Sequence, residues 1–423
     1  MLPDVFIAEI LPKLNLISTL NLAWVSKWYR DAVSAALPRT FVFEGVAGDL
    51  ADHLVRLLDD PRVRSLKKER ALELIGVHKN RLCEYACVQR NFEVLKWARN
   101  DLDLSWAPHP AGQVNDDVLA LRVLRETWPD LQERWPEAAR PEDWEGVTME
   151  DGRVVKLELM PEFYLTGAVP AAIGRLSALR HLNLFNNELT SLPAEIGQLT
   201  SLVELDLRDN RLTSVPAEIG QLTSLRCLWL FSNKLTSLPA EIGQLASLRE
   251  LYIYDNQLTS VPAEVGQLRS LERLDLQDNR LTSVPAEIGQ LTALKELFLS
   301  GNGLTSLPAE VGELRALERL GLNNTQLMSL PVEIGQLTLL KGLYLSGNQL
   351  TSMAAEIGQL RLLEELSLDH NRLTSLPAEN GQLTALTYLN LSGNQLTSVP
   401  AAIRELRAAG CNMFLDASVT FDE

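Results

Sequence analysis

The sequence predicts an α/β solenoid, a curved parallel sheet of about 11 repeats preceded by a mostly α-helical N-terminal region. The main observation is a 23-residue pattern, LxxLxLxxNxLTSLPAEIGQLTS, that recurs ten times from Leu179, after a degenerate copy at Val154. Apolar residues make up 46% of the chain and charged residues 22%, which is typical of globular proteins. At 423 residues the chain is too long for one ordinary core, so we expect separate domains.

Each 23-residue unit contains the parts of one solenoid turn. Its LxL core alternates between inward and outward positions, which predicts a short strand. The Asn that follows, as in Asn187, carries an amide that can bond the backbone groups left unpaired by the turn, and stacked copies form a ladder. Nine of the ten copies keep this Asn, and Thr325 replaces it in the other. Pro193 and its equivalents fix the backbone of the outer return, from which Ile196 and Leu199 point back into the core.

One unit cannot bury its own apolar face, so the stacked units form the core and the ends need caps. Asp116 to Trp128 has the pattern of an amphipathic helix, and Met413 to Leu415 that of a closing strand. The predicted organisation has five segments. They are an N-terminal helical segment 1–40, a helical region 41–113, an N-terminal cap 114–153, the solenoid 154–408 and a C-terminal cap 409–423.

The run LxxLPxxIGxLxxL, as found from Leu189 to Leu202, resembles the leucine-rich repeats of intracellular Ras-associated signalling scaffolds, including the plant intracellular Ras-group type. This resemblance covers about residues 154–408 and implies a leucine-rich-repeat solenoid. It also implies a protein partner, with a protein of a small-GTPase pathway as one candidate. The repeat serves many partners, so the resemblance is weakly specific for function.

The segment Trp144 to Met149 resembles the W-x-G-V-x-C cap of plant receptor-type leucine-rich repeats, with Met149 at the cysteine position. Without that cysteine the extracellular disulfide cap cannot form. Four cysteines in 423 residues make no disulfide framework either. We therefore expect a reducing compartment, the cytoplasm or alternatively the nucleus.

The first 40 residues resemble an F-box. Leu2 to Val5 opens it, Phe6, Ile10 and Leu14 share one helical face, and Leu20 to Arg30 matches the run L-x-L-A-x-V-S-K-x-W-R with Trp28 and Tyr29 shifted by one. In that family the motif docks onto the adaptor of a cullin-type ubiquitin ligase. The adaptor-docking residues that this resemblance implies are Leu2, Pro3, Ile10, Leu14, Leu22, Val25 and Trp28. The alternative is a plain amphipathic helical hairpin.

Residues 82–106 resemble a degenerate ankyrin-type helix pair, and a generic helical domain fits them equally well. Ankyrin arrays need three or more units, and at best two are present. Cys83, Cys87 and His78 make three potential metal ligands without a fourth, so we expect no metal site.

Composition and missing motifs argue against several function classes. A net charge of −16 disfavours nucleic acid as a partner. No window approaches 18 uninterrupted apolar residues, so we expect no membrane span. Walker, GxGxxG, HExxH and GxSxG motifs are absent, and a stack of near-identical units leaves little room for a unique pocket. We therefore expect neither an enzyme nor a cofactor.

The residues between the strand leucines project from the open, concave face of the predicted sheet, and they vary while the outer return is almost invariant. Trp229 and Phe231 should lie beside Tyr252 and Tyr254 on the next strand. The predicted partner-binding residues are Phe185, Asp206, Arg208, Trp229, Phe231, Glu250, Tyr252, Tyr254, Asp275, Phe298 and Tyr344. Since the three carboxylates flank the aromatic rings, we expect a partner with an apolar centre and a basic rim. The alternative is that the rings only pack on one another across strands.

Two departures from the repeat predict a weak point near residues 350–385. Ala354 replaces the usual Pro, and Asn380 stands where other copies have Ile or Val. A buried unpaired amide costs about 1–3 kcal/mol.

Together these patterns predict a protein-interaction scaffold in intracellular signalling. The alternative is a substrate-recognition subunit of a cullin-RING ubiquitin ligase. The F-box-like segment is the feature that separates them.

Overall fold

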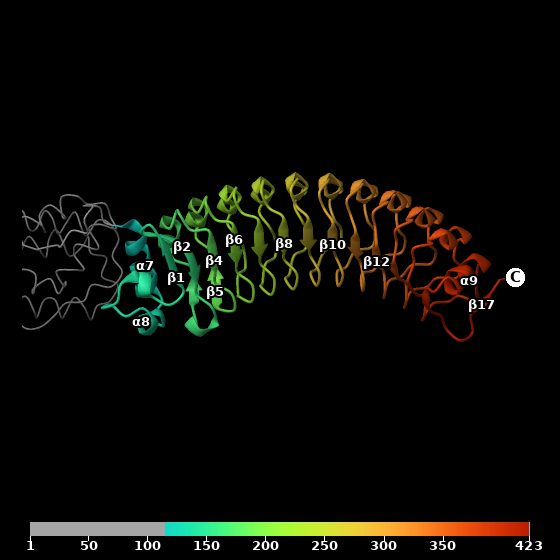
Figure 1. Ribbon diagram of the computed structural model, residues 1–423, viewed down its shortest axis with the longest axis horizontal. Helices are drawn as coiled ribbons and strands as arrows, with labels where there is room; N and C mark the ends of the chain where they lie inside the picture. The colour runs from blue at the N-terminus through green and yellow to red at the C-terminus, as the bar shows by residue number, and fades with distance from the viewer. Residues whose placement is uncertain (1–114, 423) are drawn as a thin grey trace, which may run out of the picture. The chain divides into compact units, whose positions relative to one another are not determined.

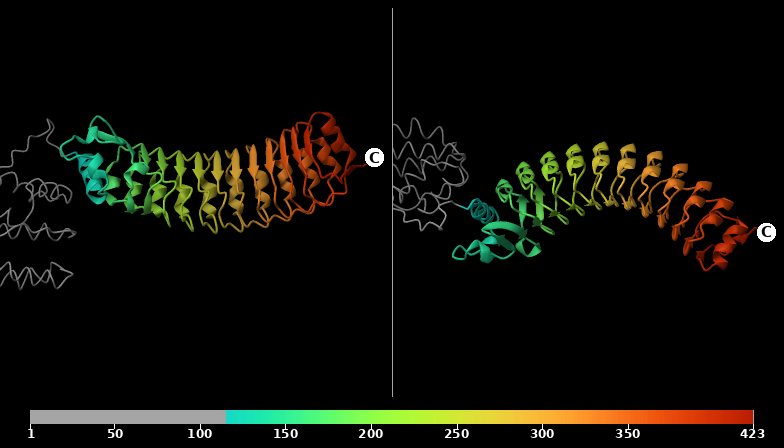
Figure 2. Two further views of the ribbon diagram at one scale, coloured as in Figure 1. Left: turned by 90° about the horizontal axis from the view of Figure 1, so that it is seen from below. Right: turned by 45° about the horizontal axis from the view of Figure 1, so that its top comes forward.

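The computed structural model describes residues 115–422, and the described part is a leucine-lined solenoid (Figure 1). The F-box-like segment 1–40, the region 41–113 with its ankyrin-like pair, and the cysteines at 83 and 87 lie outside the described residues. In the solenoid the 3₁₀ segments follow the outer edge of the arc and the strands lie inside it, which the right-hand view of Figure 2 also shows. The sheet therefore forms the concave face, and the predicted α/β solenoid is confirmed.

The main sheet has 13 strands in the order β1-β2-β4-β6-β7-β8-β9-β10-β11-β12-β13-β14-β16. Only the β1–β2 pair is antiparallel. From β4 to β14 each residue pairs with the residue 23 positions further on, as Leu205 does with Leu228. The repeat strands are β4 (His181–Asn183), β6 (Glu204–Asp206), β7 (Cys227–Trp229), β8 (Glu250–Tyr252), β9 (Arg273–Asp275), β10 (Glu296–Phe298), β11 (Arg319–Gly321), β12 (Gly342–Tyr344), β13 (Glu365–Ser367) and β14 (Tyr388–Asn390).

The outer return of every complete repeat is a five-residue 3₁₀ helix that follows a proline or, once, Ala354. Its Ile or Val, which Asn380 replaces in one repeat, is buried, as Ile242 is, and the next residue is always Gly. A Cβ on Gly243 would lie 2.3 Å from Glu264 O of the following repeat, so the glycine allows successive returns to stack closely. These helices are Ala171–Arg175, Ala194–Gln198, Ala217–Gln221, Ala240–Gln244, Ala263–Gln267, Ala286–Gln290, Ala309–Glu313, Val332–Gln336, Ala355–Gln359 and Ala378–Gln382.

The predicted asparagine ladder is confirmed, and Asn256 shows its bonds. Its Oδ1 accepts from Leu235 N at 2.9 Å, and its Nδ2 donates to Leu230 O at 3.0 Å and Ile253 O at 3.1 Å. One buried amide thus links two consecutive repeats. Because unpaired buried backbone groups are costly, this link fixes how the repeats stack.

The residue immediately before each ladder position adopts a left-handed conformation. Gly301, Gly347 and Gly393 occupy this position in three repeats, while the others carry a side chain, as in Ser232 with φ 53°. Asn and Asp tolerate this region better than other non-glycine residues, and they occupy most of the remaining copies. The backbone therefore turns in the same way after each of these strands.

The N-terminal cap is built around buried tryptophans rather than a disulfide. Trp135 and Trp144 stack with ring centroids 4.9 Å apart, and their indole N–H groups donate to Glu145 O and Pro136 O. The buried Asp117 carboxylate accepts from Val154 N at 2.7 Å and from Arg153 Nε at 3.1 Å. The elements of this cap and the first turn are α7 (Asp116–Thr127), α8 (Leu131–Arg134), a 3₁₀ helix (Pro141–Asp143), β1 (Val147–Glu150), β2 (Arg153–Glu158), a 3₁₀ helix (Pro161–Phe163), β3 (Thr166–Ala168) and β5 (Glu188–Ser191).

The helix predicted over residues 116–128 corresponds to α7, and the degenerate first repeat to β2. Met149, at the position of the cap cysteine, packs half-buried against the core. At the other end the solenoid closes with α9 (Ala401–Ala408), β15 (Ser398–Val399), β16 (Asn412–Phe414) and β17 (Thr420–Phe421). The closing strand begins one residue before the predicted one and pairs in parallel with β14.

Asn380 lies in the core, as predicted, with 2% of its surface exposed. Its Oδ1 is buried without a hydrogen-bond partner. In the preceding repeat Ile357 occupies this site and is fully buried. The sequence therefore places an unpaired amide oxygen where the other repeats have only apolar contacts.

Candidate protein-binding surface on the sheet face

The concave face consists of the residues on either side of each strand's central leucine. In β7, for example, Leu228 is buried while Cys227 and Trp229 are partly exposed. Residues two positions beyond the strand, such as Phe231, project from the same face. Because successive repeats pair 23 residues apart, equivalent side chains form columns that run across the strands.

Two stacks of aromatic and arginine side chains cross these strands. The first stack is Phe185, Arg208, Phe231 and Tyr254, one residue from each of four consecutive repeats. The Arg208 guanidinium lies 4.5 Å from the Phe185 ring centroid and 5.6 Å from that of Phe231. The rings of Phe231 and Tyr254 lie 4.2 Å apart and nearly parallel, at an angle of 12°.

The second stack is Trp229, Tyr252, Arg273 and Phe298. Its rings of Trp229 and Tyr252 stack at 6.3 Å with an interplanar angle of 10°. The Arg273 guanidinium lies 5.1 Å from the Tyr252 ring centroid and 4.9 Å from that of Phe298. Each arginine is therefore held between two rings, an arrangement that cation–π attraction favours.

A hollow of about 430 Å³ lies on this face. We call it the concave hollow. Its lining residues are Arg208, Trp229, Phe231, Tyr252, Tyr254, Arg273, Asp275, Gln277 and Asp278. Its volume lies within the range of about 300–1,000 Å³ that is common for ligand pockets.

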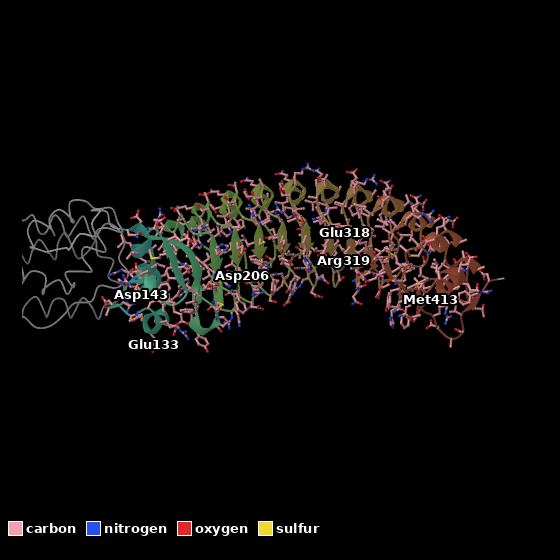
Figure 3. The ribbon with its side chains drawn as sticks, viewed as in Figure 1. Glu133, Asp143, Asp206, Glu318, Arg319 and Met413 are labelled. Carbon is pink, nitrogen blue, oxygen red and sulfur yellow. The ribbon has the colours of Figure 1, made fainter. Side chains whose placement is uncertain are left out.

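Two of the three carboxylates expected to face a partner are buried instead. Asp206, labelled on the inner face in Figure 3, is only 8% exposed and Asp275 only 3%. Asp206 Oδ2 lies 3.2 Å from Arg208 Nε, and Asp275 accepts both from Gln277 Nε2 and from its backbone N–H. Burial raises the pKa of both carboxyls. The prediction that these two side chains form an exposed acidic rim is therefore wrong, because both carboxylates are buried and bond within the sheet, although Asp275 still lines the concave hollow.

Glu250 also bonds within the surface. Its Oε2 accepts from Tyr252 OH at 2.9 Å. Burial and this carboxylate raise the pKa of Tyr252 to about 12, so the phenol keeps its proton at neutral pH.

The acidic rim of the concave hollow comes from residues that the sequence analysis did not single out. Asp255 and Asp278 are exposed and occupy the left-handed position after β8 and β9, as Asp209 does after β6. The signal was present in the sequence, since an Asp precedes the ladder Asn in these repeats. That this Asp is exposed at the end of its strand became clear only from the left-handed turn in which the structure places it.

Models of three leucine-rich-repeat families match this chain. The leucine-rich repeat region model matches residues 152–260 and 287–375, the leucine rich repeat model matches 246–304, and the model of two leucine-rich repeat copies matches 361–404. Together they cover residues 152–404, more than half of the sequence. The chain is a leucine-rich-repeat protein.

Several solved structures are similar to this leucine-rich-repeat protein. The ectodomain of the Arabidopsis receptor kinase HAESA, solved with an IDA peptide hormone, is 28% identical over 72% of this chain and 53% of its own, with a TM-score of 0.58. The plant peptide hormone receptor RGFR1, solved with RGF2, is 29% identical over 66% of this chain and 53% of its own, with a TM-score of 0.53. This chain therefore spans about half the length of these receptor chains.

A leucine-rich-repeat protein of Leptospira interrogans is 37% identical over 59% of this chain and 81% of its own, with a TM-score of 0.40. No curated protein sequence matches the chain.

The leucine-rich repeats bring most of the predicted site residues together, but not all. Phe298 belongs to the second stack. Tyr344 lies two strands further along and donates to Glu365 Oε2 at 2.7 Å, outside the residues that line the concave hollow.

Cys227 lies on the same face between two carboxylates. Burial, followed by the charges of Glu250 and Glu204, raises the pKa of this thiol to about 11, so it remains a thiol at neutral pH. Within residues 115–422 no group of three or more His, Cys, Asp or Glu side chains is arranged to hold a metal ion. None of the helices in this part of the chain is long and apolar enough to cross a membrane.

The outer side of these leucine-rich repeats is less uniform than the sequence analysis assumed. Several exposed apolar residues replace the usual Thr, Ala or Ser of the repeat, which are small or polar. They are Met328 (57% exposed), Val332 (53%), Leu339 (45%) and Leu362 (45%).

Proposed function

We propose that this leucine-rich-repeat protein is a non-enzymatic scaffold that binds a partner protein on its concave face. The observation that carries the proposal is the pair of aromatic and arginine stacks around the concave hollow. The rings project from the open face, and the leucines beneath them already complete the core. Aromatic and arginine side chains dominate the binding energy of protein interfaces.

The alternative, that the rings only pack on one another, accounts for part of the geometry. Trp229 stacks on Tyr252 and Phe231 on Tyr254, yet all four remain partly exposed and border the hollow. Rigid, pre-stacked rings lose little conformational freedom when a partner covers them. Stacking therefore favours binding as well as stability.

The similar solved structures support a peptide segment as the bound element. HAESA was solved with an IDA peptide hormone and RGFR1 with RGF2. By analogy, we propose that this chain binds an extended segment of its partner.

We propose an intracellular role, in the cytoplasm or alternatively the nucleus, with a small-GTPase pathway protein among the candidate partners. The support is the sequence resemblance to intracellular Ras-associated repeats and the methionine at position 149 of the cap. Fractionation of source cells would test the location, and recovery in a secreted fraction would contradict it.

The test of the scaffold function is the double variant Trp229→Ala with Tyr252→Ala. The partner is first captured from source lysate and identified, and its Kd is then measured with both proteins purified. We expect the double variant to weaken binding by at least about 2 kcal/mol with little loss of stability, because truncated aromatic anchors lose their contacts with the partner.

A control variant, Met328→Ala with Leu362→Ala, removes exposed apolar surface outside the hollow and should leave the Kd unchanged. Normal binding by the Trp229 and Tyr252 double variant would place the partner elsewhere. Unfolding of that variant would make the rings structural.

The second candidate function is that of a substrate-recognition subunit in a cullin-RING ubiquitin ligase, favoured by the F-box-like run from Leu20 to Arg30. Its test is Ile10→Asp, which places a charge on the apolar face that would contact the ligase adaptor. We expect adaptor binding to be lost while the solenoid stays folded, with Glu9→Ala as the control. Adaptor binding that survives the change, or that is never seen with the intact chain, would remove this candidate.

A further inference from the structure

The first stack ends at Tyr254, and its last ring has one covered face. Phe231 covers the face toward β7 at 4.2 Å. The next residue of the same column is Gln277, 23 positions on, but its Nε2 donates to Asp275 Oδ1 at 3.1 Å and Oδ2 at 3.3 Å. Gln277 is thus engaged with the carboxylate of its own strand, and Tyr254, Gln277 and Asp278 together line the concave hollow.

The charges around this end of the stack are unbalanced. Arg208 lies beside Asp206, and Arg273 Nη1 lies 2.5 Å from Glu296 Oε2, so each arginine has an acidic partner. Asp278 lines the hollow and is exposed. Asp255, the equivalent residue one repeat earlier, is also exposed and accepts from Ser232 Oγ at 2.9 Å. Among residues 115–422 no cation pairs with Asp255 or Asp278, so these two carboxylates are not neutralised there.

The protein itself twice places a guanidinium on such rings. Arg208 lies between Phe185 and Phe231, and Arg273 lies between Tyr252 and Phe298, each beside a carboxylate. At Tyr254 the chain supplies a ring, and the exposed carboxylate of Asp278 lines the same hollow, while the next side chain of the column, Gln277, is neutral.

We propose that the concave hollow takes an arginine side chain from an extended segment of a partner protein, with its guanidinium against Tyr254 and paired with Asp278. This inference rests on the proposed function, because it names the chemistry that the same surface recognises. A planar guanidinium can stack its flat face on a ring while the N–H groups at its edge donate two hydrogen bonds to a carboxylate. A lysine ammonium pairs with the carboxylate but stacks poorly, and an aromatic side chain stacks but leaves the carboxylate unpaired.

The experiment uses the intact chain and a displayed library of random linear dodecapeptides as the probe. Peptides are selected on the wild type, and each selected arginine is replaced by lysine and by citrulline, which keeps the shape and removes the charge. We expect arginine to be enriched among the binders. We also expect the citrulline version of a peptide to bind about tenfold more weakly or worse, since a charge-assisted bond and a cation–π contact are both lost.

Asp278→Asn is the matching change in the protein, because Asn occupies the same left-handed position at 186 and 324 and should preserve the turn. It should remove most of the difference between the arginine and citrulline peptides. Glu365→Gln, which removes a carboxylate charge from the same face outside the hollow lining, should leave that difference intact.

The possible outcomes distinguish failure of the arginine site from failure of the proposed scaffold function. Binders that depend on Trp229 and Tyr252 but show no arginine enrichment, or no response to Asp278→Asn, would overturn the arginine site and leave the scaffold function standing. Selected binders that ignore Trp229 and Tyr252, or a library that yields no binder, would contradict both.

Discussion

The two halves of the concave face share one framework but present different surfaces. From β6 to β10 the exposed columns carry Trp229, Phe231, Tyr252, Tyr254 and Phe298 with two arginines between them. From β11 to β13 the same columns carry mostly small or polar residues. A Cβ on Gly321 would lie 2.7 Å from Phe298 Cδ1, so this glycine leaves space for the last ring of the second stack.

The two halves also differ in the buried residues beneath the sheet. The asparagine ladder is uninterrupted beneath the two stacks, whereas Thr325, Ala354 and Asn380 all lie in the second half. Stacked rings require their strands to keep a constant spacing and register, and the ladder enforces both. The two stacks of rings and arginines thus lie on the half whose asparagine ladder is uninterrupted, and we infer that their alignment depends on that ladder. Three predictions test this comparison, from the largest expected effect to the smallest.

Removing a ladder amide beneath the stacks should destabilise the protein most. Asn256→Ala leaves Leu235 N–H and the carbonyls of Leu230 and Ile253 without their side-chain partner, so we expect a loss of about 2–4 kcal/mol in the free energy of unfolding. Urea unfolding monitored by circular dichroism measures it. Asn394→Ala, at the partly exposed last ladder position, is the matched control and should cost about 1 kcal/mol or less. Equal losses at the two sites would contradict the comparison.

Repairing the second half should stabilise it. Asn380→Ile removes a buried carbonyl oxygen that has no partner, and we expect a gain of about 1–3 kcal/mol with a higher unfolding temperature. Amide hydrogen exchange in the wild type should be faster over residues 350–385 than over 200–300, and the variant should slow it. The reciprocal change Ile357→Asn, one repeat earlier, should destabilise the protein. Equally slow exchange in both regions of the wild type would show that Asn380 creates no weak point.

The smallest effect is expected at the interrupted ladder position. The single hydroxyl hydrogen of Thr325 can be donated either to Leu322 O, at 3.2 Å, or to Asn348 Oδ1. Thr325 has no amide to accept from Leu304 N–H or to donate to Leu299 O. Thr325→Asn should therefore add about 1 kcal/mol, measured by the same urea unfolding. Thr325→Ser keeps only the hydroxyl and should show no gain. A destabilised Asn variant would mean that the local backbone no longer fits the ladder.

The sequence by itself determined the solenoid, the register of its strands, the asparagine ladder and the buried Asn380. All of these follow from a fixed 23-residue spacing and from the twofold alternation of side chains along a strand, which are properties of the chain order alone. It also predicted which side chains share the open face, including the two pairs of neighbouring rings.

Only the tertiary structure decided what those side chains do to one another. It buried Asp206 and Asp275, placed Arg208 and Arg273 between rings, and moved the acidic rim to the left-handed turn residues Asp255 and Asp278. The pattern specifies the face on which a residue lies. The contacts that its side chain makes depend on the residues of the neighbouring repeats, which differ from one repeat to the next, and on the conformation of the turn. The repeat spacing contains neither piece of information.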